Sequence, residues 1–362
     1  MEMEDILIST DAVLYAKAPQ PKINYGHIDN LTDNTGMIQH AVFSIPNRKE
    51  GYCIDDNARA LLWAVWACKN DPRNKIANRL LPVYLSFVHY MQTEDGGFKN
   101  FLNYARTSME ERGSEDSFGR TIMALGFLIN EGRNLSFVRT AQHIFYKACP
   151  QIDKLTSLRG IANTIIGLCQ VIKFNFPDDL KREMVIKLSD KMVDMYQHNK
   201  TIDWKWFEPV LSYDNAMLPL ALLNAYEVTQ DERYLTIAFE SMQFLESKVF
   251  HNNIVRPVGN EAWHKKDGPL SQFDQQGIDV MAMILYYQQA FRITRDPAYL
   301  AQMDKSYQWF LGNNDLGLSL YDPSTGGCAD GLHAGGINLN QGAESTLSYW
   351  ISHLVAHSNQ ST

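Results

Sequence analysis

Six segments of the sequence share one pattern, in which a short polar or acidic cluster leads into a run that is apolar on nearly every side of a helix. A helix that is apolar all round must be covered by other elements on all sides. The intervals between the clusters are long enough for two helices of ordinary length plus loops. The clusters are anchored at Asp56, Asp116, Gly160, Asp214, Gln276 and Gln341.

A second kind of helix is predicted in the intervals. Between residues 178 and 196, apolar side chains recur every three or four residues, while Lys and Asp fill many of the other positions. This spacing is typical of an amphipathic helix with one face in water. Similar helices are expected to begin near residues 75, 135, 232 and 297.

An inner ring of six covered helices inside an outer ring of amphipathic helices satisfies both patterns. The predicted fold is therefore an all-α (α/α)₆ toroid. An open solenoid of helix pairs is the alternative, but every polar cluster precedes its helix, which favours a closed ring with one working end. No Pro-, Gly- or Ser-rich linker divides the chain. We expect an irregular lead-in at 1–33 and one toroid domain at 34–362, with a short first outer helix at 34–43.

Composition excludes several classes of function. The 362 residues carry 33 Lys and Arg against 41 Asp and Glu, a net charge of −8. Without a basic run, the chain is not expected to bind nucleic acid, since phosphate binding needs clustered Lys and Arg. The five cysteines form no Cys-x-x-Cys pair, and no disulfide framework, metal site or cofactor is predicted. No apolar run is long enough to span a membrane and no signal peptide is recognised, so a cytoplasmic location is expected.

Acidic side chains at the starts of the predicted inner helices are candidate catalytic groups. These helices all begin at one end of the ring, where free N–H groups and the helix dipole stabilise negative charge, although each acid is also a candidate helix cap. Glycoside hydrolysis needs one protonated and one ionised carboxyl group, whose separation decides between retention and inversion. We favour Asp55 or Asp56 as one member and Glu115 or Asp116 as the other. The predicted catalytic candidates are Asp55, Asp56, Glu115, Asp116, Glu208 and Asp214.

Loops ahead of these helices bring tryptophans and polar side chains together. Residues 203–208 contain two indoles and two acids, and residues 260–264 again pair an acid with a Trp. Indole faces stack on the apolar faces of sugar rings, and carboxylates, amides and guanidinium groups bind hydroxyls. The alternative is that the indoles are core anchors. The predicted substrate-binding residues are Arg59, Trp204, Trp206, Tyr213, Trp263, His264, Asp274, His333 and Glu344.

Two other functions stay open. His264 and His333 lie in these loops and are candidates for the acid and base of a sugar isomerase or epimerase, an enzyme class also found on helical toroids. A carbohydrate-binding accessory domain without chemistry is the second alternative. The motifs of zinc metalloproteases, P-loop nucleotide-binding proteins and α/β-hydrolases do not occur.

The sequence resembles a bacterial six-hairpin glycosidase-like family at two places. The resemblance is carried by residues 40–46 (HAVFSIP) with 51–61 (GYCIDDNARAL), and by residues 340–346 (NQGAEST). Members of that family occur alone or fused behind glycosyltransferase domains. The resemblance implies an (α/α)₆ toroid acting on mannose-containing oligosaccharides, with a glycosyltransferase as a functional partner, and it also accommodates the accessory domain. Asp55-Asp56 is similar to the adjacent aspartates that form the catalytic signature of endo-α-mannanases with the same general fold.

Overall fold

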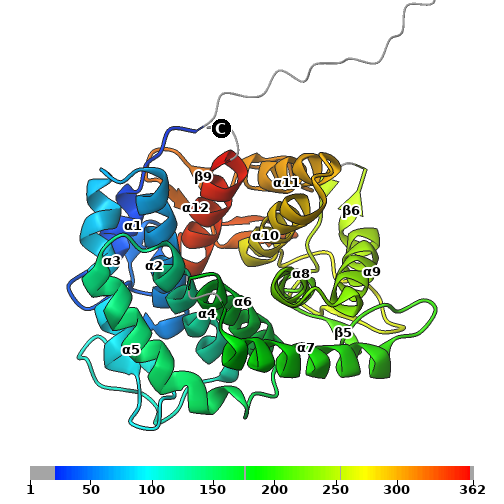
Figure 1. Ribbon diagram of the computed structural model, residues 1–362. Coiled ribbons are helices and arrows are strands. Elements are labelled where there is room, and N and C mark those ends of the chain that lie inside the picture. The colour runs from blue at the N-terminus through cyan, green and yellow to red at the C-terminus, as the bar shows by residue number, and fades with distance from the viewer. Residues whose placement is uncertain (1–20, 175–176, 253, 359–362) are drawn as a thin grey trace, which may run out of the picture.

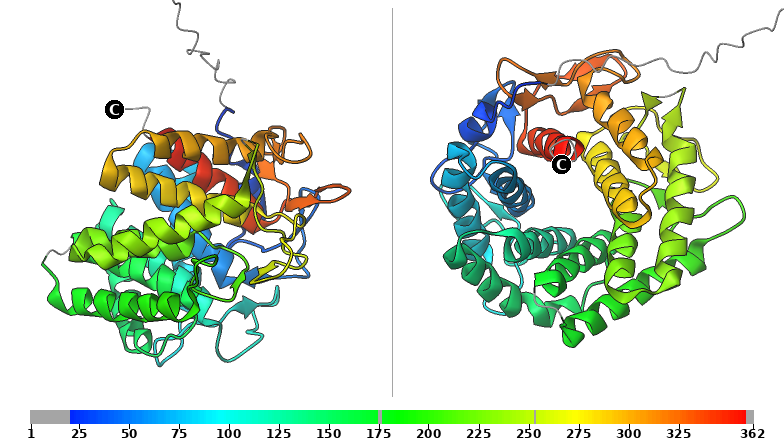
Figure 2. Two further views of the ribbon diagram at one scale, coloured as in Figure 1. Left: turned by 90° about the vertical axis from the view of Figure 1, so that its right-hand side faces the viewer. Right: turned by 45° about the horizontal axis from the view of Figure 1, so that its top comes forward.

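The computed structural model describes residues 21–174, 177–252 and 254–358. Six of the described helices stand side by side around a common axis (Figures 1 and 2). Each contacts the next, from α2 through α4, α6, α8, α10 and α12, and α12 contacts α2 again. This closure confirms the toroid and excludes the open solenoid. The inner helices are α2 (Ile54–Asn70), α4 (Glu115–Glu131), α6 (Leu158–Phe174), α8 (Met217–Thr229), α10 (Gly277–Thr294) and α12 (Ala343–Ser358).

An outer layer of helices covers this ring. Each outer helix packs against the inner helix that precedes it in the chain, and α1 packs against α12. The amphipathic helices expected near 75, 135, 232 and 297 and between 178 and 196 are confirmed. The remaining helices are α1 (Gly26–Leu31), α3 (Lys75–Met91), α5 (Leu135–Ile152), α7 (Asp179–Asn199), α9 (Glu232–Val249) and α11 (Ala298–Gln308), which a 3₁₀ turn (Trp309–Leu311) extends.

The first outer helix lies earlier in the chain than the sequence suggested. It is α1 at Gly26–Leu31, within the segment expected to be irregular. Residues 34–43 instead form bridges and the first strand, so a helix there was a wrong prediction. The physical reason is that Ile28 and Leu31 of α1 are fully buried, whereas Val42 and Phe43 point into solvent. Residues 1–20 lie outside the described residues, and the domain boundary at 33/34 stays a prediction.

Helices α4 and α6 approach each other backbone to backbone. A Cβ added at Gly119 would lie 2.3 Å from the carbonyl oxygen of Gly160, and one at Gly126 would lie 2.4 Å from that of Gly167. Real side chains do not tolerate such distances, so glycine is required at these contacts. The seven-residue spacing of the glycines in both helices keeps this close face in register over two turns.

The described strands are short and lie in the segments that lead from an outer helix to the next inner helix. These loops gather at one end of the ring, where the inner helices begin, and we call this end the mouth (Figure 2, left). Connections at the other end, the opposite rim, are shorter, as at 71–74, 132–134, 230–231 and 295–297. None of the described helices is long and apolar enough to cross a membrane.

All strand pairs are antiparallel and two-stranded. Two of the pairs, β3–β4 and β5–β8, join loops that precede different inner helices and so tie neighbouring parts of the mouth together. The pairs are β1 (Ala41–Val42) with β2 (Ile45–Pro46), β3 (Tyr52–Cys53) with β4 (Phe101–Leu102), β5 (Val210–Leu211) with β8 (His264–Lys265), β6 (Phe250–His251) with β7 (Ile254–Val255), β9 (Tyr321–Asp322) with β10 (Gly327–Cys328), and β11 (Gly331–His333) with β12 (Gly336–Asn338).

Candidate functional site

A cleft of about 590 Å³ opens at the mouth of the toroid. The first turns of α2, α4 and α12 and the segments before α8 and α10 line it. We call it the central cleft. Its charged and titratable lining residues are His40, Cys53, Asp55, Asp56, Arg59, Asp116, Arg120, Tyr213, Asp330 and Glu344.

Arg59 links the first inner helix, α2, to the last, α12, where the ring closes. The guanidinium of Arg59 donates to the carboxylate of Asp56 on its own helix and to that of Glu344 on α12, both at 2.6 Å. Arg59 and Asp56 are buried, whereas the Glu344 side chain is 43% exposed. One buried cation therefore holds two cleft-lining carboxyl groups within the span of its own guanidinium, and Glu344 is the more exposed of the two.

A second arginine reaches across the ring. Arg120 of α4 donates to Asp55 of α2, and it donates to Asp214, before α8, at 3.0 Å. Asp214 is buried and takes the left-handed backbone region, with φ of 51°. Its second carboxylate oxygen has no hydrogen-bond partner. Asp214 therefore serves to anchor Arg120 beneath the cleft, and it does not line the cleft itself.

A third arginine, Arg159, holds the segment that carries Tyr213, a lining residue of the central cleft. Arg159 of α6 donates to the carbonyl oxygen of Tyr213 at 2.7 Å and to the carboxylate of Glu208 at 2.9 Å. Its guanidinium lies 4.6 Å from the centre of the Tyr213 ring. Neither Arg159 nor Glu208 lines the central cleft. This predicted catalytic acid is therefore engaged in holding a loop.

The adjacent acids at the start of α4 have different positions. Glu115 accepts hydrogen bonds of 2.6 Å from the backbone N–H groups of Thr156 and Ser157, so it caps the beginning of α6. It is a capping residue rather than a member of the cleft. Asp116 lines the cleft and accepts hydrogen bonds from the hydroxyls of Ser157 and Tyr213.

Burial changes the acidity of two carboxyl groups at the mouth. Burial raises the pKa of Asp56 to about 6, even though Arg59 opposes the shift. Burial and the neighbouring charge of Asp214 raise the pKa of Asp279 to about 8. Asp279 lies in the first turn of α10 and bonds Asn215, which precedes α8, at 3.3 Å. Near neutral pH, the mouth thus holds both protonated and ionised carboxyl groups.

Two of the three predicted sugar platforms are core residues. Trp206 is fully buried, and Trp204 is buried against Phe244. Neither presents a ring face to a ligand, because the loop that carries them folds inward over α9. Trp263 is 37% exposed and bonds Asn260, but it lines neither cleft at the mouth.

The two predicted histidines are separated. His264 is on β8 beside Trp204 and lines neither cleft. His333 is on β11 and lines a second cleft of about 610 Å³ together with Asp274. This outer cleft shares Gln276, Asp330 and Asn338 with the central cleft, so the two are continuous.

Several cleft residues were not predicted from the sequence, among them His40, Arg120 and Asp330. One signal was available for Arg120, since an arginine follows the start of three successive inner helices at 59, 120 and 159. A polar side chain inside an apolar helix needs a buried partner. No comparable signal marks His40, which precedes α2 on an extended segment.

The described residues contain no group of three or more His, Cys, Asp or Glu arranged to hold a metal ion. Arginine side chains pair with three of the acids in the central cleft, Asp55, Asp56 and Glu344. Asp116 and Asp330 instead accept hydrogen bonds from hydroxyl groups or a backbone N–H. Part of the negative charge is therefore compensated, and the cleft presents both hydrogen-bond donors and acceptors to a ligand.

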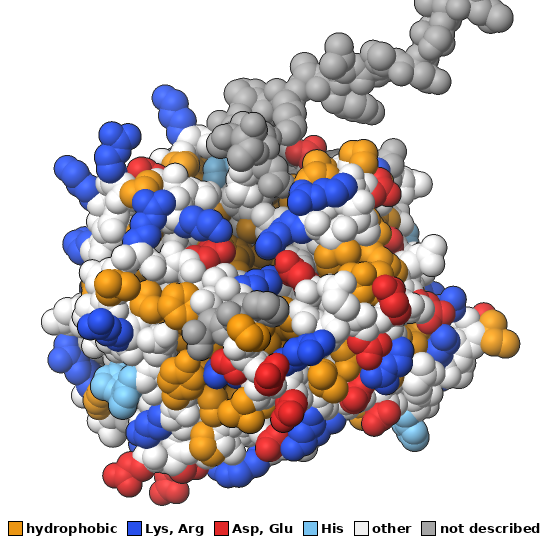
Figure 3. Space-filling model, in the orientation of Figure 1, with side chains coloured by type: hydrophobic (Ala, Val, Ile, Leu, Met, Phe, Trp, Pro, Cys, Tyr) orange, Lys and Arg blue, Asp and Glu red, His pale blue; other side chains and the backbone are white. Residues whose placement is uncertain are grey.

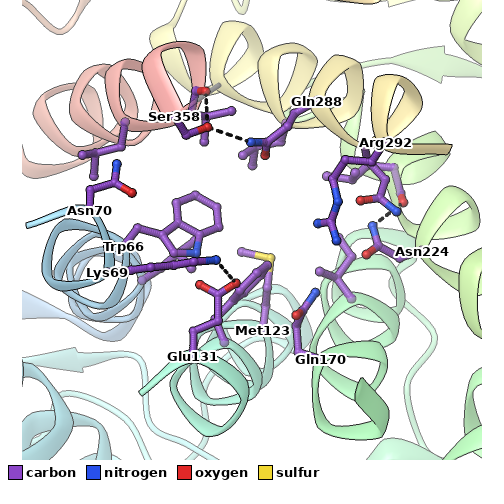
Figure 4. A pocket seen from close by; sticks show the side chains of 18 residues that line it. Trp66, Lys69, Asn70, Met123, Glu131, Gln170, Asn224, Gln288, Arg292 and Ser358 are labelled. Carbon is purple, nitrogen blue, oxygen red and sulfur yellow. Dashed lines mark hydrogen bonds and ion pairs between the residues drawn. The ribbon is translucent and has the colours of Figure 1, made fainter. Parts of the chain in front are cut away.

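A smaller pocket of about 140 Å³ lies inside the opposite rim (Figure 4). Lys69 and Glu131 form an ion pair of 2.8 Å, which lies between Trp66 and Met123 in this view. This pocket carries fewer acids than the mouth, and its long polar side chains come from the last turns of the inner helices.

On the face presented in Figure 1, side chains of both charges are interspersed (Figure 3).

No protein-family model matches the chain, and no curated protein matches its sequence significantly. Solved structures do match in fold. A sugar epimerase from a ruminal bacterium is 10% identical, with a TM-score of 0.73 over 93% of this chain and 95% of that chain. Cellobiose 2-epimerase from Bacillus thermoamylovorans is 12% identical, with a TM-score of 0.71 over the same shares.

A glycoside hydrolase family 76 α-mannanase from Bacteroides thetaiotaomicron is 15% identical, with a TM-score of 0.65 over 92% of each chain. These proteins carry different activities on one scaffold, so the likeness establishes the fold and leaves the chemistry to the residues of the site. The chain therefore shares the (α/α)₆ toroid fold of the six-hairpin glycosidase-like proteins.

Proposed function

We propose that this protein is a carbohydrate-active enzyme that hydrolyses glycosidic bonds in the central cleft. The observation that carries the proposal is the set of carboxyl groups in one cleft: Asp55 and Asp56 from α2, Asp116 from α4, and Glu344 from α12. Hydrolysis of a glycoside needs such a pair, with one member protonated and the other ionised.

Asp56 and Glu344 have the properties of such a pair. Burial raises the pKa of Asp56 to about 6, so a fraction of this carboxyl group is protonated near neutral pH. Glu344 is the more exposed of the two and ion-pairs with Arg59. In the proposed step, Asp56 donates its proton to the glycosidic oxygen as the C–O bond breaks. Glu344 acts as the base towards water or as the nucleophile towards the sugar carbon.

The remaining polar groups suit the binding of sugar hydroxyls. Asp55 and Asp116 accept hydrogen bonds, while Arg120 and the Tyr213 hydroxyl hold these two carboxylates in place. An oligosaccharide containing mannose is the proposed substrate, because the resemblance to the six-hairpin glycosidase-like family implies mannose-containing glycans and a family 76 α-mannanase shares the fold. A glycosyltransferase as a functional partner stays a prediction.

Sugar epimerisation is the second candidate. It is favoured by the fold neighbours, since the two epimerases have higher TM-scores than the mannanase. Epimerisation next to a carbonyl needs groups that remove and return a proton. Among the described residues lining the central cleft, His40 is the one histidine. His333 lines the outer cleft, and His264 lines neither. The residues at the site therefore support carboxylate chemistry better than a pair of histidines.

Reduced manno-oligosaccharides separate the two reactions. A hydrolase cleaves them and incorporates ¹⁸O from labelled water into a shorter product, which mass spectrometry detects. An epimerase that acts at the reducing end needs the free aldehyde, so it leaves them unchanged but exchanges deuterium into the unreduced sugars in D₂O. Cleavage without exchange supports hydrolysis. Exchange without cleavage contradicts it and supports the second candidate.

Conservative variants then test the assigned pair. Asp56→Asn and Glu344→Gln should each lower the cleavage rate by about 10²–10⁴-fold, as expected for loss of an acid–base group. Glu115→Gln is the matched control, because Glu115 caps α6 outside the cleft. A folded Asp56→Asn variant with unchanged activity would remove Asp56 from the mechanism.

A further inference from the structure

We propose that the outer cleft is a second sugar subsite, with the exposed ring of Phe43 as its stacking platform. This inference rests on the proposed function and deepens it, because it makes the substrate an oligosaccharide that occupies both clefts at once. The two clefts are continuous and of similar size, about 590 and 610 Å³. A single sugar bound in the central cleft would leave the outer cleft empty.

Polar side chains line the outer cleft without positive charge from Lys or Arg. Among its described lining residues are Asn260, Asp274, His333 and Asn338, which offer hydrogen-bond donors and acceptors. The carboxylates of Asp274 and Asp330 make it unsuited to a phosphate group. The ligand chemistry that fits is a neutral sugar unit with several hydroxyls.

Phe43 supplies the apolar face that such a sugar needs. Its side chain lines the outer cleft and is 61% exposed. Phe43 and Ser44 form the two-residue loop between β1 and β2, and φ of Phe43 is 51°. Gly or Asn usually occupies such a left-handed position, because a bulky side chain is strained there. A strained aromatic side chain that is 61% exposed adds little to the core, so ligand contact explains its position better than folding does.

The backbone of Phe43 is fixed to the segment that leads into α12. Its N–H donates to the Asn340 side chain at 2.9 Å, and its carbonyl oxygen accepts from the N–H of Gln341 at 2.8 Å. The same segment continues into Glu344. The backbone that carries the ring is therefore held at a set position relative to the proposed catalytic carboxylate, as a subsite next to the point of cleavage requires.

Binding of sugars of increasing length tests the inference. The probes are mannose, mannobiose, mannotriose and mannotetraose, titrated calorimetrically in an Asp56→Asn background that blocks turnover. Phe43→Asn suits the left-handed backbone and removes only the ring. We expect it to weaken binding of the longest sugar about tenfold and to leave mannose binding unchanged. Phe43→Trp should restore the affinity for the longer sugars.

Ile45→Asn is the matched control, since Ile45 is exposed on the same hairpin but does not line the outer cleft. Equal affinities of the parent and the Phe43→Asn variant at every length overturn the inference and leave the proposed function intact. If Phe43→Asn instead converts a dimer into a monomer, measured by light scattering, the ring belongs to a subunit interface and the inference is wrong. A parent that binds none of these sugars contradicts the proposed function itself.

Discussion

The two ends of the toroid differ in how deeply their ion pairs are buried. At the mouth, the side chains of Arg59, Arg120 and Arg159 are buried and each pairs with a carboxylate. At the opposite rim, the ion pairs are more exposed: the Lys69 side chain in the Lys69–Glu131 pair is 54% exposed and the Glu227 side chain in the Lys173–Glu227 pair is 31% exposed. Both ends are built from the same helices, so the difference comes from which residues begin and end them.

This difference distinguishes charged side chains that are placed for function from those that have little effect on stability. Surface ion pairs cost little to form and contribute little. Buried ion pairs carry a large desolvation cost that apolar side chains would avoid. A chain that places three buried arginines and several raised-pKa acids at one end therefore accepts lower stability there, which is expected where pKa values are set for chemistry.

The largest expected effect comes from removing a buried cation at the mouth. Arg120→Ala leaves Asp55 and Asp214 without their shared partner, and we expect it to lower the free energy of unfolding by about 3–5 kcal/mol. Lys69→Ala, at the opposite rim, should cost at most about 1 kcal/mol. Urea unfolding of both variants measures the contrast.

A double variant identifies the cause of the Arg120 effect. Arg120→Met combined with Asp214→Asn removes the two most buried charges together, keeps the side-chain volumes similar and leaves the more exposed Asp55. It should recover part of the lost stability, because no uncompensated charge is left at Asp214. If Arg120→Ala costs no more than Lys69→Ala, the two ends do not differ in the way described.

The second effect is a pH dependence of opposite sign at the two ends. Burial raises the pKa of Asp279 from its ordinary value of 3.8 to about 8. Between pH 4 and 8, the folded protein therefore holds a proton that the unfolded chain releases, and stability falls as pH rises through this window. Asp279→Asn should flatten that decline, by up to about 1.4 kcal/mol per pH unit where the proton difference is complete.

Glu227 at the opposite rim gives the contrasting case. Burial raises its pKa, but the ion pair with Lys173, the hydrogen bond from Gln289 and the charge of Arg292 together lower the pKa of Glu227 overall. Its contribution is present above its unfolded pKa and is lost as pH falls, so Glu227→Gln should lower stability at neutral pH more than at acidic pH. Thermal unfolding from pH 2 to 8 compares the two variants, because the Glu227 contribution is lost below its unfolded pKa of 4.5 and the Asp279 effect lies between 3.8 and about 8. Equal slopes for both would refute the assigned signs.

The ring could be predicted from the sequence because the spacing of apolar residues along a helix depends on which of its faces are buried. Helices apolar all round proved to be the inner ones, and amphipathic helices proved to be the outer ones. The sequence also indicated that the starts of the inner helices would meet, which brought Asp55, Asp56, Arg59, Asp116, Tyr213 and Glu344 into one cleft.

The rest of the site depends on the paths of the loops, and loop residues show no regular apolar spacing from which their direction could be predicted. An indole in a polar loop looks the same whether it points inward, as Trp206 does, or outward, as Trp263 does. Likewise, the partners of Arg120 lie in segments far along the chain, and only the closed ring brings them together. Glu115 and Asp116 are adjacent in sequence, yet one caps α6 and the other faces the cleft, because successive helical residues point in different directions.

The smallest expected effect concerns strained backbone at the two ends. Phe43 at the mouth and Gln230, which ends α8 at the opposite rim, both take the left-handed region, with φ of 51° and 62°. Asn tolerates this region better than either residue, so each substitution to Asn should raise the free energy of unfolding by up to about 1 kcal/mol. The two substitutions should differ in their effect on sugar binding. Relief at Gln230 should leave sugar binding unchanged, whereas relief at Phe43 should weaken it, since the strained ring is placed for the ligand. Urea unfolding and sugar titration on the same two variants test this, and a Phe43→Asn variant that loses stability would show that the ring contributes to folding.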